Sequence, residues 1–177
     1  EAMHNLRMTK SLLIAGGGIA GMAVGFAAAQ AGWHAQVFER AAEFSEVGAG
    51  VQLGPNVTRI LQSWGLTSAL RQVAAFPSGL HARSMPTGEV LATLPVRDAE
   101  SRYGAPYVTM HRADLHGLLL QAAHAQGVRV HSDAVVQAVT HTPDAALFDV
   151  VQNAHTQRHA VDAAVAADGV WSPLRQQ

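Results

Sequence analysis

Three glycines near the start of the chain have the spacing of a phosphate-binding turn. Gly16, Gly18 and Gly21 form a Gly-x-Gly-x-x-Gly pattern between an apolar run and an alanine-rich segment. The first glycine permits the tight turn, the second lets the backbone approach a diphosphate, and the third lets a helix pack near the strand. The free amides and the positive dipole end of that helix would face the phosphates. The chemistry that this spacing predicts is dinucleotide binding.

A carboxylate follows where such a site needs one. Glu39 lies eighteen residues after Gly21, close to the roughly 20 expected for an acid that accepts a hydrogen bond from a ribose hydroxyl. A carboxylate there repels a 2′-phosphate, so we expect an unmodified ribose, as in FAD or NAD. Arg40 could counter that repulsion or simply be solvated, and it joins the candidate cofactor-binding residues.

One βαβ unit is expected to position these groups. Ser11 to Ala15 is an apolar run typical of a strand covered on both faces, and His34 to Phe38 gives a second strand pattern. Between them, the alanine-rich segment from Ala20 to Ala31 predicts a helix that ends at Gly32. Strand, glycine turn, helix and strand within about thirty residues make one such unit.

The rest of the chain departs from a simple dinucleotide fold. Residues 41–54 read as a Gly/Ala-rich excursion and residues 95–106 as a loop. The apolar spacing predicts helices at 56–64, 67–74 and 112–126, and a hairpin formed by 80–85 and 89–94. Further strands are expected at 128–131, 134–141, 146–152 and 159–167, the last two forming an antiparallel hairpin joined by 153–158.

Composition excludes several classes of protein. The chain has 177 residues, 49% of them apolar and 14% charged, with a formal net charge of −1, so it should be globular. This charge balance offers no electrostatic footprint for nucleic acid or for an anionic membrane. No apolar stretch reaches the ~20 residues of a membrane-spanning helix. The chain has no cysteine, which excludes disulfides and thiolate chemistry and fits a cytoplasmic location.

The spacing of the histidines does not predict a metal site. His155 and His159 fall in the expected hairpin connection, where their spacing does not place them on one face.

Residues 1–7 precede a natural start at Met8, so we expect an expression remnant or an unprocessed extension there. The domain should therefore comprise residues 8–177.

Four stretches together resemble a known family. They read LLIAGGGIAGMAVGFAAAQAG with VFER, then VGAGVQLGPNVTRIL, then VTMHRADLHGLLL, then VAADGVWSPLR. In this order and spacing they resemble the N-terminal part of the FAD-dependent aromatic hydroxylases, single-component flavoprotein monooxygenases of the salicylate and hydroxybenzoate hydroxylase type. The first stretch is shared by many flavin and NAD proteins, whereas the Asp-Gly stretch is peculiar to these monooxygenases and their close relatives.

The resemblance implies an α/β fold: a Rossmann-like FAD-binding domain of the glutathione reductase type, with antiparallel β additions and incomplete at its C-terminus. Residues 78–106 would be an inserted piece of the substrate domain. The implied parent enzyme uses NAD(P)H and O₂ to hydroxylate a small phenolic or benzoate-like substrate. The 177-residue chain alone is expected to be inactive, because the family's second Gly-Asp fingerprint and most of its substrate domain lie further along.

The resemblance also implies roles for individual residues at the adenosine and diphosphate end of FAD. Gly16, Gly18 and the backbone at Ile19 and Ala20 would hold the pyrophosphate, next to Gly21 of the same fingerprint. The ribose of the adenosine would contact the acid that ends the second strand, Glu39.

The remaining implied contacts come from later in the chain. The backbone at Gly50-Val51 would approach the isoalloxazine ring, although a mobile glycine loop is the simpler alternative. Arg112 would contact the ribityl or phosphate region, unless it belongs to a solvated helix face. The backbone near Val136 would contact adenine. Asp168, in the Asp-Gly motif, would serve both FAD and NAD(P)H binding, the alternative being a surface turn.

Two interpretations that assign the chain to other functional classes stay open. The βαβ unit also permits a NAD-dependent dehydrogenase domain, which the insertions and the Asp-Gly ending disfavour. A non-catalytic module is the other, in which an incomplete sheet pairs its open edges with a second copy. Because an incomplete domain leaves apolar surface exposed, we expect a homodimer.

Overall fold

A computed structural model describes residues 9–44 and 49–176. The extension expected at residues 1–7 lies outside the described residues. The chain divides into two compact units, one formed by Glu1–Ser45 with Leu119–Gln177 and the other by Glu46–Leu118. No helix in the described part of the chain is long and apolar enough to cross a membrane.

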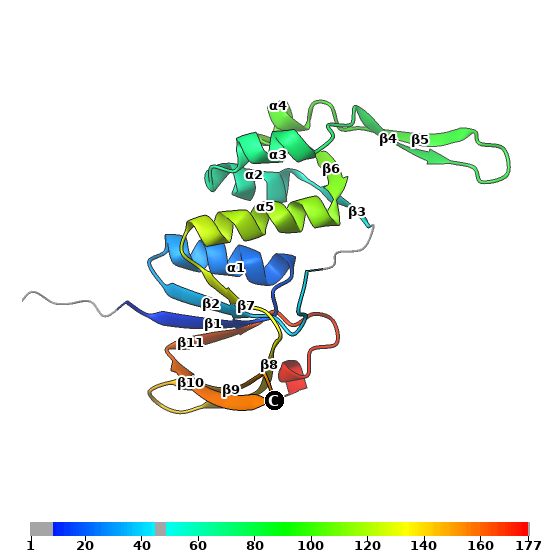
Figure 1. The fold of residues 1–177 in the computed structure, drawn as a ribbon. Coiled ribbons are helices and arrows are strands. Elements are labelled where there is room, and N and C mark those ends of the chain that lie inside the picture. The colour runs from blue at the N-terminus through cyan, green and yellow to red at the C-terminus, as the bar shows by residue number, and fades with distance from the viewer. Residues whose placement is uncertain (1–8, 45–48, 177) are drawn as a thin grey trace, which may run out of the picture. The chain divides into compact units, whose positions relative to one another are not determined.

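The first unit is built on a four-stranded parallel sheet of order β11-β1-β2-β7 (Figure 1). Its strands are β1 (Ser11–Ala15), β2 (His34–Phe38), β7 (Arg129–His131) and β11 (Ala163–Ala166). Helix α1 (Ile19–Gln30) covers one face, where a Cβ on Gly25 would meet side chains of Ile14, Val37 and Val128. The strand–helix–strand unit expected from the sequence is confirmed.

An antiparallel sheet of order β10-β9-β8 packs on the other side of the same unit (Figure 1). Its strands are β8 (Ala134–His141), β9 (Ala146–Gln152) and β10 (His155–Val161). Phe148 of this sheet is buried with Leu13 and Phe38 of the parallel sheet in one apolar cluster. The α/β fold class with antiparallel additions is therefore confirmed.

The end of the first unit differs from the expectation. One strand was expected at 159–167, joined to 146–152 through 153–158. Instead β10 already starts at His155 after a tight turn at Asn153 and Ala154, both with positive φ. The chain then leaves the antiparallel sheet, and β11 pairs in parallel with β1. Asp168 consequently follows a parallel strand, and the 3₁₀ turn η1 (Leu174–Gln176) ends the described chain.

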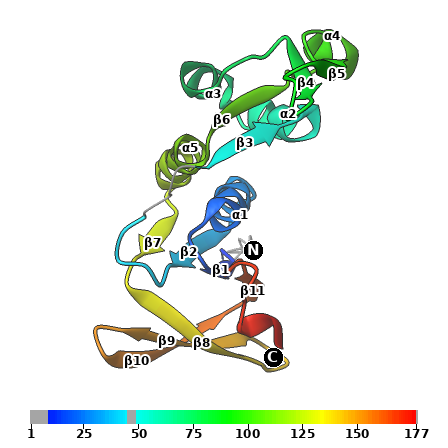
Figure 2. The same ribbon diagram turned by 90° about the vertical axis from the view of Figure 1, so that its right-hand side faces the viewer.

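The second unit combines short strands and helices (Figure 2). Its elements are β3 (Gly50–Leu53), α2 (Pro55–Ser63), α3 (Thr67–Val73), β4 (Gly79–Arg83), β5 (Val90–Pro95), α4 (Ala99–Tyr103), β6 (Val108–His111) and the start of α5 (Arg112–Ala125). The α2, α3 and α5 helices and the β4–β5 hairpin agree with the expectation. The excursion and loop also contain β3 and α4, and β6, which had not been expected either, pairs antiparallel with β3.

Candidate functional site

The glycine turn has three distinct environments for its three glycines. Gly16 has φ +103°, and a Cβ there would lie 2.4 Å from the carbonyl oxygen of Ala167. A Cβ on Gly21 would lie 1.9 Å from the carbonyl oxygen of Gly16, whereas one on Gly18 would meet nothing within 4 Å. Packing therefore requires glycine at the first and third positions, while the second faces open space.

The start of α1 presents backbone amides at this open space. Gly18 precedes the helix in an extended conformation without a side-chain cap, and the first intrahelical bond is donated by the Met22 amide to the Gly18 carbonyl, at 3.0 Å. The amides of Ile19 and Ala20 thus precede the helical ladder and lack an intrahelical acceptor. Such amides, together with the helix dipole, favour an anion.

Glu39 is tied to the turn by its own carboxylate. Its Oε2 accepts a hydrogen bond from the Gly17 amide at 2.6 Å, and its Oε1 accepts one from the Ala41 amide at 2.8 Å. A carboxylate offers about four lone-pair positions, so both oxygens can still accept from a ligand's hydroxyls. The amides fix where those positions point. The sequence indicated the carboxylate but not its two amide partners, because they depend on the fold of the turn.

A cavity of about 240 Å³ opens at this edge of the parallel sheet. Six of the residues singled out in the sequence line it: Gly16, Gly18, Glu39, Arg40, Val136 and Asp168. The others are Ala15, Phe38, Ala134, Val135, Ala167, Gly169, Pro173 and Leu174. Sequence reasoning missed most of this apolar wall, although the quoted Asp-Gly stretch contained Gly169, Pro173 and Leu174. All of these residues belong to the first unit.

Asp168 brings into this cavity a buried carboxylate that has no partner among the described residues. Both of its carboxylate oxygens are buried and make no hydrogen bond in the described structure. A buried carboxylate without donors is unfavourable, and such an exception in a folded protein calls for an explanation. A ligand that brings hydroxyl donors would remove the penalty. The ribose and ribityl hydroxyls of FAD are such donors, so the residues present fit this cofactor.

Three further candidates lie together in the second unit. In the β3–β6 ladder, Gly50 faces His111 and Val51 faces Met110. The Arg112 amide donates to the carbonyl of Ala49 at 2.8 Å, which extends the same ladder. The antiparallel pairing thus brings Gly50, Val51 and Arg112 to one end of this short sheet, and their flavin contacts stay predictions.

A histidine lies directly behind the wall of the cavity. The ring of His131 stacks on Phe38 with 4.5 Å between centroids, and the His131 carbonyl accepts the Glu39 amide at 2.8 Å. Partial burial, helped by the nearby positive charges of His159 and Arg129, lowers the pKa of His131 below its ordinary value. The neutral ring is therefore the form that this packing favours.

These features define a class of protein. A parallel sheet, a glycine turn opening a helix, and an acid at the tip of the neighbouring strand form a dinucleotide-binding domain of the Rossmann type. Residues 9–177 match the model of the FAD binding domain family, so the chain belongs to that family.

Known relatives and structures agree with this assignment. The chain is 37% identical over 175 residues to the FAD-dependent monooxygenase OpS4 of Beauveria bassiana, covering 98% of this chain and 40% of that protein. It is 35% identical over 177 residues to 3-hydroxybenzoate 6-hydroxylase 1 of Aquipseudomonas alcaligenes, covering 99% and 43%. The crystal structure of a 2-methyl-3-hydroxypyridine-5-carboxylic acid oxygenase mutant, 27% identical, superposes with a TM-score of 0.79, covering 95% and 42%. The chain therefore spans about 40% of the length of these relatives.

Replacing Gly18 or Gly21 by alanine should separate binding from stability. Gly18→Ala adds a methyl group to open space, so the melting temperature should stay unchanged while the Kd for FAD rises by about tenfold or more. Gly21→Ala drives a methyl group into backbone and should cost about 1–3 kcal/mol of unfolding free energy. Thermal unfolding and fluorescence titration with FAD measure the two effects. Unchanged FAD affinity in Gly18→Ala would contradict this assignment of the turn.

The folded protein should lose stability in mild acid through His131. Because its folded pKa lies below the ordinary 6.5, the unfolded chain binds the proton more readily. The stabilisation is fully present above pH 6.5 and is lost as the pH falls towards and through the lower folded value. Urea unfolding at pH 7.5 and at pH 5.5 should show a smaller loss in His131→Gln than in the wild type. His124→Gln, at an exposed position of α5, is the matched control and should keep the wild-type loss.

Proposed function

We propose that this chain is the FAD-binding portion of an NAD(P)H- and O₂-dependent monooxygenase that hydroxylates a phenolic or benzoate-like aromatic compound. The observation that carries the proposal is the cavity of the first unit. There Gly16 and Gly18 of the glycine turn, the anchored carboxylate of Glu39 and the partnerless carboxylate of Asp168 line one space of about 240 Å³.

The three polar parts of the cavity suit three parts of a dinucleotide. The diphosphate belongs at the turn and the start of α1, where amides and the helix dipole favour negative charge. The adenosine ribose belongs at Glu39, whose oxygens are oriented by the Gly17 and Ala41 amides. Further hydroxyls belong at Asp168, and apolar contacts from Ala134 to Val136 would support a flat ring.

The proposed reaction draws on the names of the relatives. One of them is a 3-hydroxybenzoate 6-hydroxylase, and a solved structure of similar fold is an oxygenase of a hydroxypyridine carboxylic acid. Bound FAD would supply the redox and oxygen chemistry. The residues of this chain would bind and orient the cofactor, and we propose that Gly50, Val51 and Arg112 do so at the flavin end, with residues 78–106 contributing a piece of the substrate domain. We also propose a cytoplasmic location and a homodimer.

Asp168→Asn provides the direct test of the cofactor site. The amide removes a buried unpaired charge, so the melting temperature of the apoprotein should stay equal or rise. At the same time the Kd for FAD should increase by about tenfold, because charged hydrogen bonds to hydroxyls are lost. Asp144→Asn, an exposed carboxylate to amide change, is the control and should leave both values unchanged.

The same titrations distinguish the proposed FAD domain from the alternative, a NAD-dependent dehydrogenase domain. Such a domain would bind NAD⁺ more tightly than FAD, and the purified protein would lack flavin absorbance. Equal FAD affinity in Asp168→Asn and the wild type, or a preference for NAD⁺, would refute the proposed site.

The 177-residue chain on its own should not catalyse the reaction. It spans about 40% of the length of its relatives, so more than half of the length of such an enzyme has no counterpart in these 177 residues. We expect no aromatic-substrate-dependent NAD(P)H oxidation and no hydroxylated product when FAD, NAD(P)H and 3-hydroxybenzoate are supplied. If liquid chromatography detects more hydroxylated product than a control with free FAD and no protein gives, this expectation is wrong.

A further inference from the structure

Two histidines contact the aromatic ring of Phe38, a residue that lines the cavity of the first unit. His131 of β7 stacks on the Phe38 ring, with 4.5 Å between the centroids and 14° between the planes. His159 of β10 meets the same ring edge-on, at 5.2 Å and 61°. Because β7 and β10 belong to different sheets, these contacts tie the two sheets of the first unit together. We call the three side chains the His–Phe–His cluster.

The main chain of this cluster holds the polar parts of the cavity. The carbonyl of Phe38 accepts a hydrogen bond from the Gly16 amide at 2.8 Å, and the carbonyl of His131 accepts one from the Glu39 amide at 2.8 Å. The carbonyl of Glu39 in turn accepts from the Ala134 amide at 2.9 Å. A displacement of Phe38 or His131 would therefore move the start of the glycine turn and Glu39 together.

The charges around the cluster favour neutral rings. Partial burial and the positive charges of His159 and Arg129 all lower the pKa of His131. Nε2 of His131 lies 3.0 Å from the amide oxygen of Gln36, which can accept a hydrogen bond but brings no negative charge. Two charged imidazole rings in contact with Phe38 would repel each other, since like charges in close contact are unfavourable.

Other charged groups on or beside these strands do not neutralise the cluster. Arg158 precedes His159, but it binds both carboxylate oxygens of Asp149, at 2.7 and 2.8 Å. Consecutive residues of a strand point to opposite faces, so this ion pair lies on the other face of β10. Asp133 is exposed after the end of β7. The carboxylate of Glu39 is engaged by two backbone amides of its own.

We propose that the His–Phe–His cluster is a proton-sensitive support of the nucleotide site, which holds the glycine turn and Glu39 in place at neutral pH and loosens them in mild acid. An unperturbed histidine changes charge at about pH 6.5. When both rings are charged, they separate, Phe38 loses its stacking partner, and the end of β2 shifts with it. The consequence for the cofactor, release of FAD in acid, rests on the proposed function, whereas the movement of the turn does not.

Nuclear magnetic resonance of the full 177-residue chain without FAD tests the support directly. The amide signals of Gly16 and Glu39 should shift with the same midpoint as the ring protons of His131. His159→Gln should raise that midpoint, because it removes a positive charge that lowers the pKa of His131. His124→Gln, at an exposed position of α5, is the matched control and should leave the midpoint unchanged. Amide signals that stay fixed while the ring titrates, or an unchanged midpoint in His159→Gln, would overturn the proposal.

FAD titrations at pH 7.5 and pH 5.5 test the consequence for the cofactor. The wild-type Kd should be about threefold or more higher at pH 5.5, because acid populates the loosened state. In His131→Gln the ratio of the two Kd values should fall towards one. Circular dichroism at pH 5.5 checks that each chain is still folded. Equal Kd values at the two pH values, or tighter binding in acid because charged rings simply attract the diphosphate, would count against the proposal.

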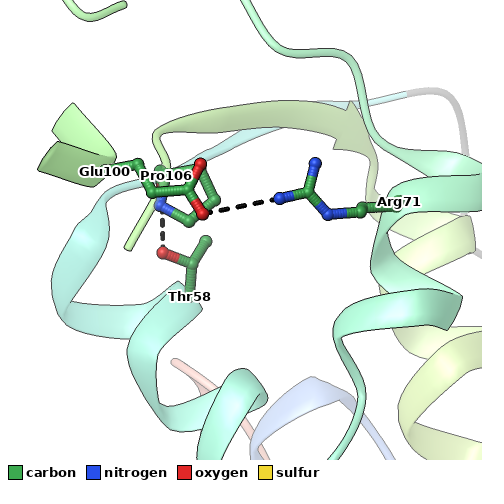
Figure 3. Close-up of polar contacts among 4 residues, drawn as sticks. All are labelled: Thr58, Arg71, Glu100 and Pro106. Atoms are coloured by element: carbon green, nitrogen blue, oxygen red, sulfur yellow. Dashed lines mark hydrogen bonds and ion pairs between the residues drawn. The ribbon is translucent and has the colours of Figure 1, made fainter. Parts of the chain in front are cut away.

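An ion pair in the second unit provides the second control. Figure 3 shows Arg71 extending from α3 towards Glu100 of α4, where Nη2 and Oε1 are 3.4 Å apart. Both side chains are about half exposed, 52% and 53%, so the pair is weak. Glu100→Gln should keep the wild-type ratio of Kd values. No FAD binding at pH 7.5 would refute the proposed function, and the amide signals of the chain without FAD would still decide whether the cluster supports the turn.

Discussion

The close approach of two stretches of backbone at the end of β1 governs the proposed nucleotide site. Gly16 lies against Ala167 with no room for a side chain, and Gly21 lies against Gly16 in the same way. Since β1 is flanked in parallel by β2 and β11, the carboxyl ends of all three strands meet there. The ends of these strands supply the glycine turn, Glu39 and Asp168 respectively. A single side chain inserted at Gly16 would push this arrangement apart.

The two carboxylates at this edge illustrate how position decides what a charge can do. Glu39 is satisfied by two backbone amides, so it is stable without a ligand and serves as a fixed acceptor. Asp168 has no donor, so folding leaves it at a cost of roughly 1–3 kcal/mol or more for a polar group of this kind. A ligand with hydroxyl donors returns that free energy as affinity. Because both acids repel phosphate, the diphosphate is confined to the amides of the turn.

Local sequence patterns predicted the individual helices and strands well, but they did not predict which strands pair when those strands are far apart in the sequence. The alanine-rich helix and the strands on either side of it are encoded within thirty residues, and the glycines mark their limits. The run from His159 to Ala167 has no glycine or proline to divide it, so its sequence predicts one continuous strand. The division falls at Asp162, whose carboxylate accepts from both the amide and the hydroxyl of Ser11, each at 2.7 Å. That contact joins residues 151 positions apart, which no local pattern reveals.

The candidate site was predictable to the extent that it uses backbone geometry. The glycines and Glu39 act through a turn and a strand end, and spacing alone indicates both. The part of the apolar wall from Ala134 to Val136 depends on the packing of the antiparallel sheet against the parallel one. A sequence pattern specifies neither this packing nor the missing partner of Asp168.

The cavity of the first unit is too small to hold a whole dinucleotide. At about 240 Å³ it is smaller than the roughly 300–1,000 Å³ of ordinary ligand pockets, so it suits one end of a dinucleotide. Its lining comes wholly from the first unit, so none of the contacts proposed there for the adenosine and the diphosphate involves residues 46–118. Gly50, Val51 and Arg112, the candidates for the flavin end, are gathered instead by the β3–β6 ladder. We therefore propose that affinity for the cofactor and placement of its reactive ring are encoded in separate parts of the chain.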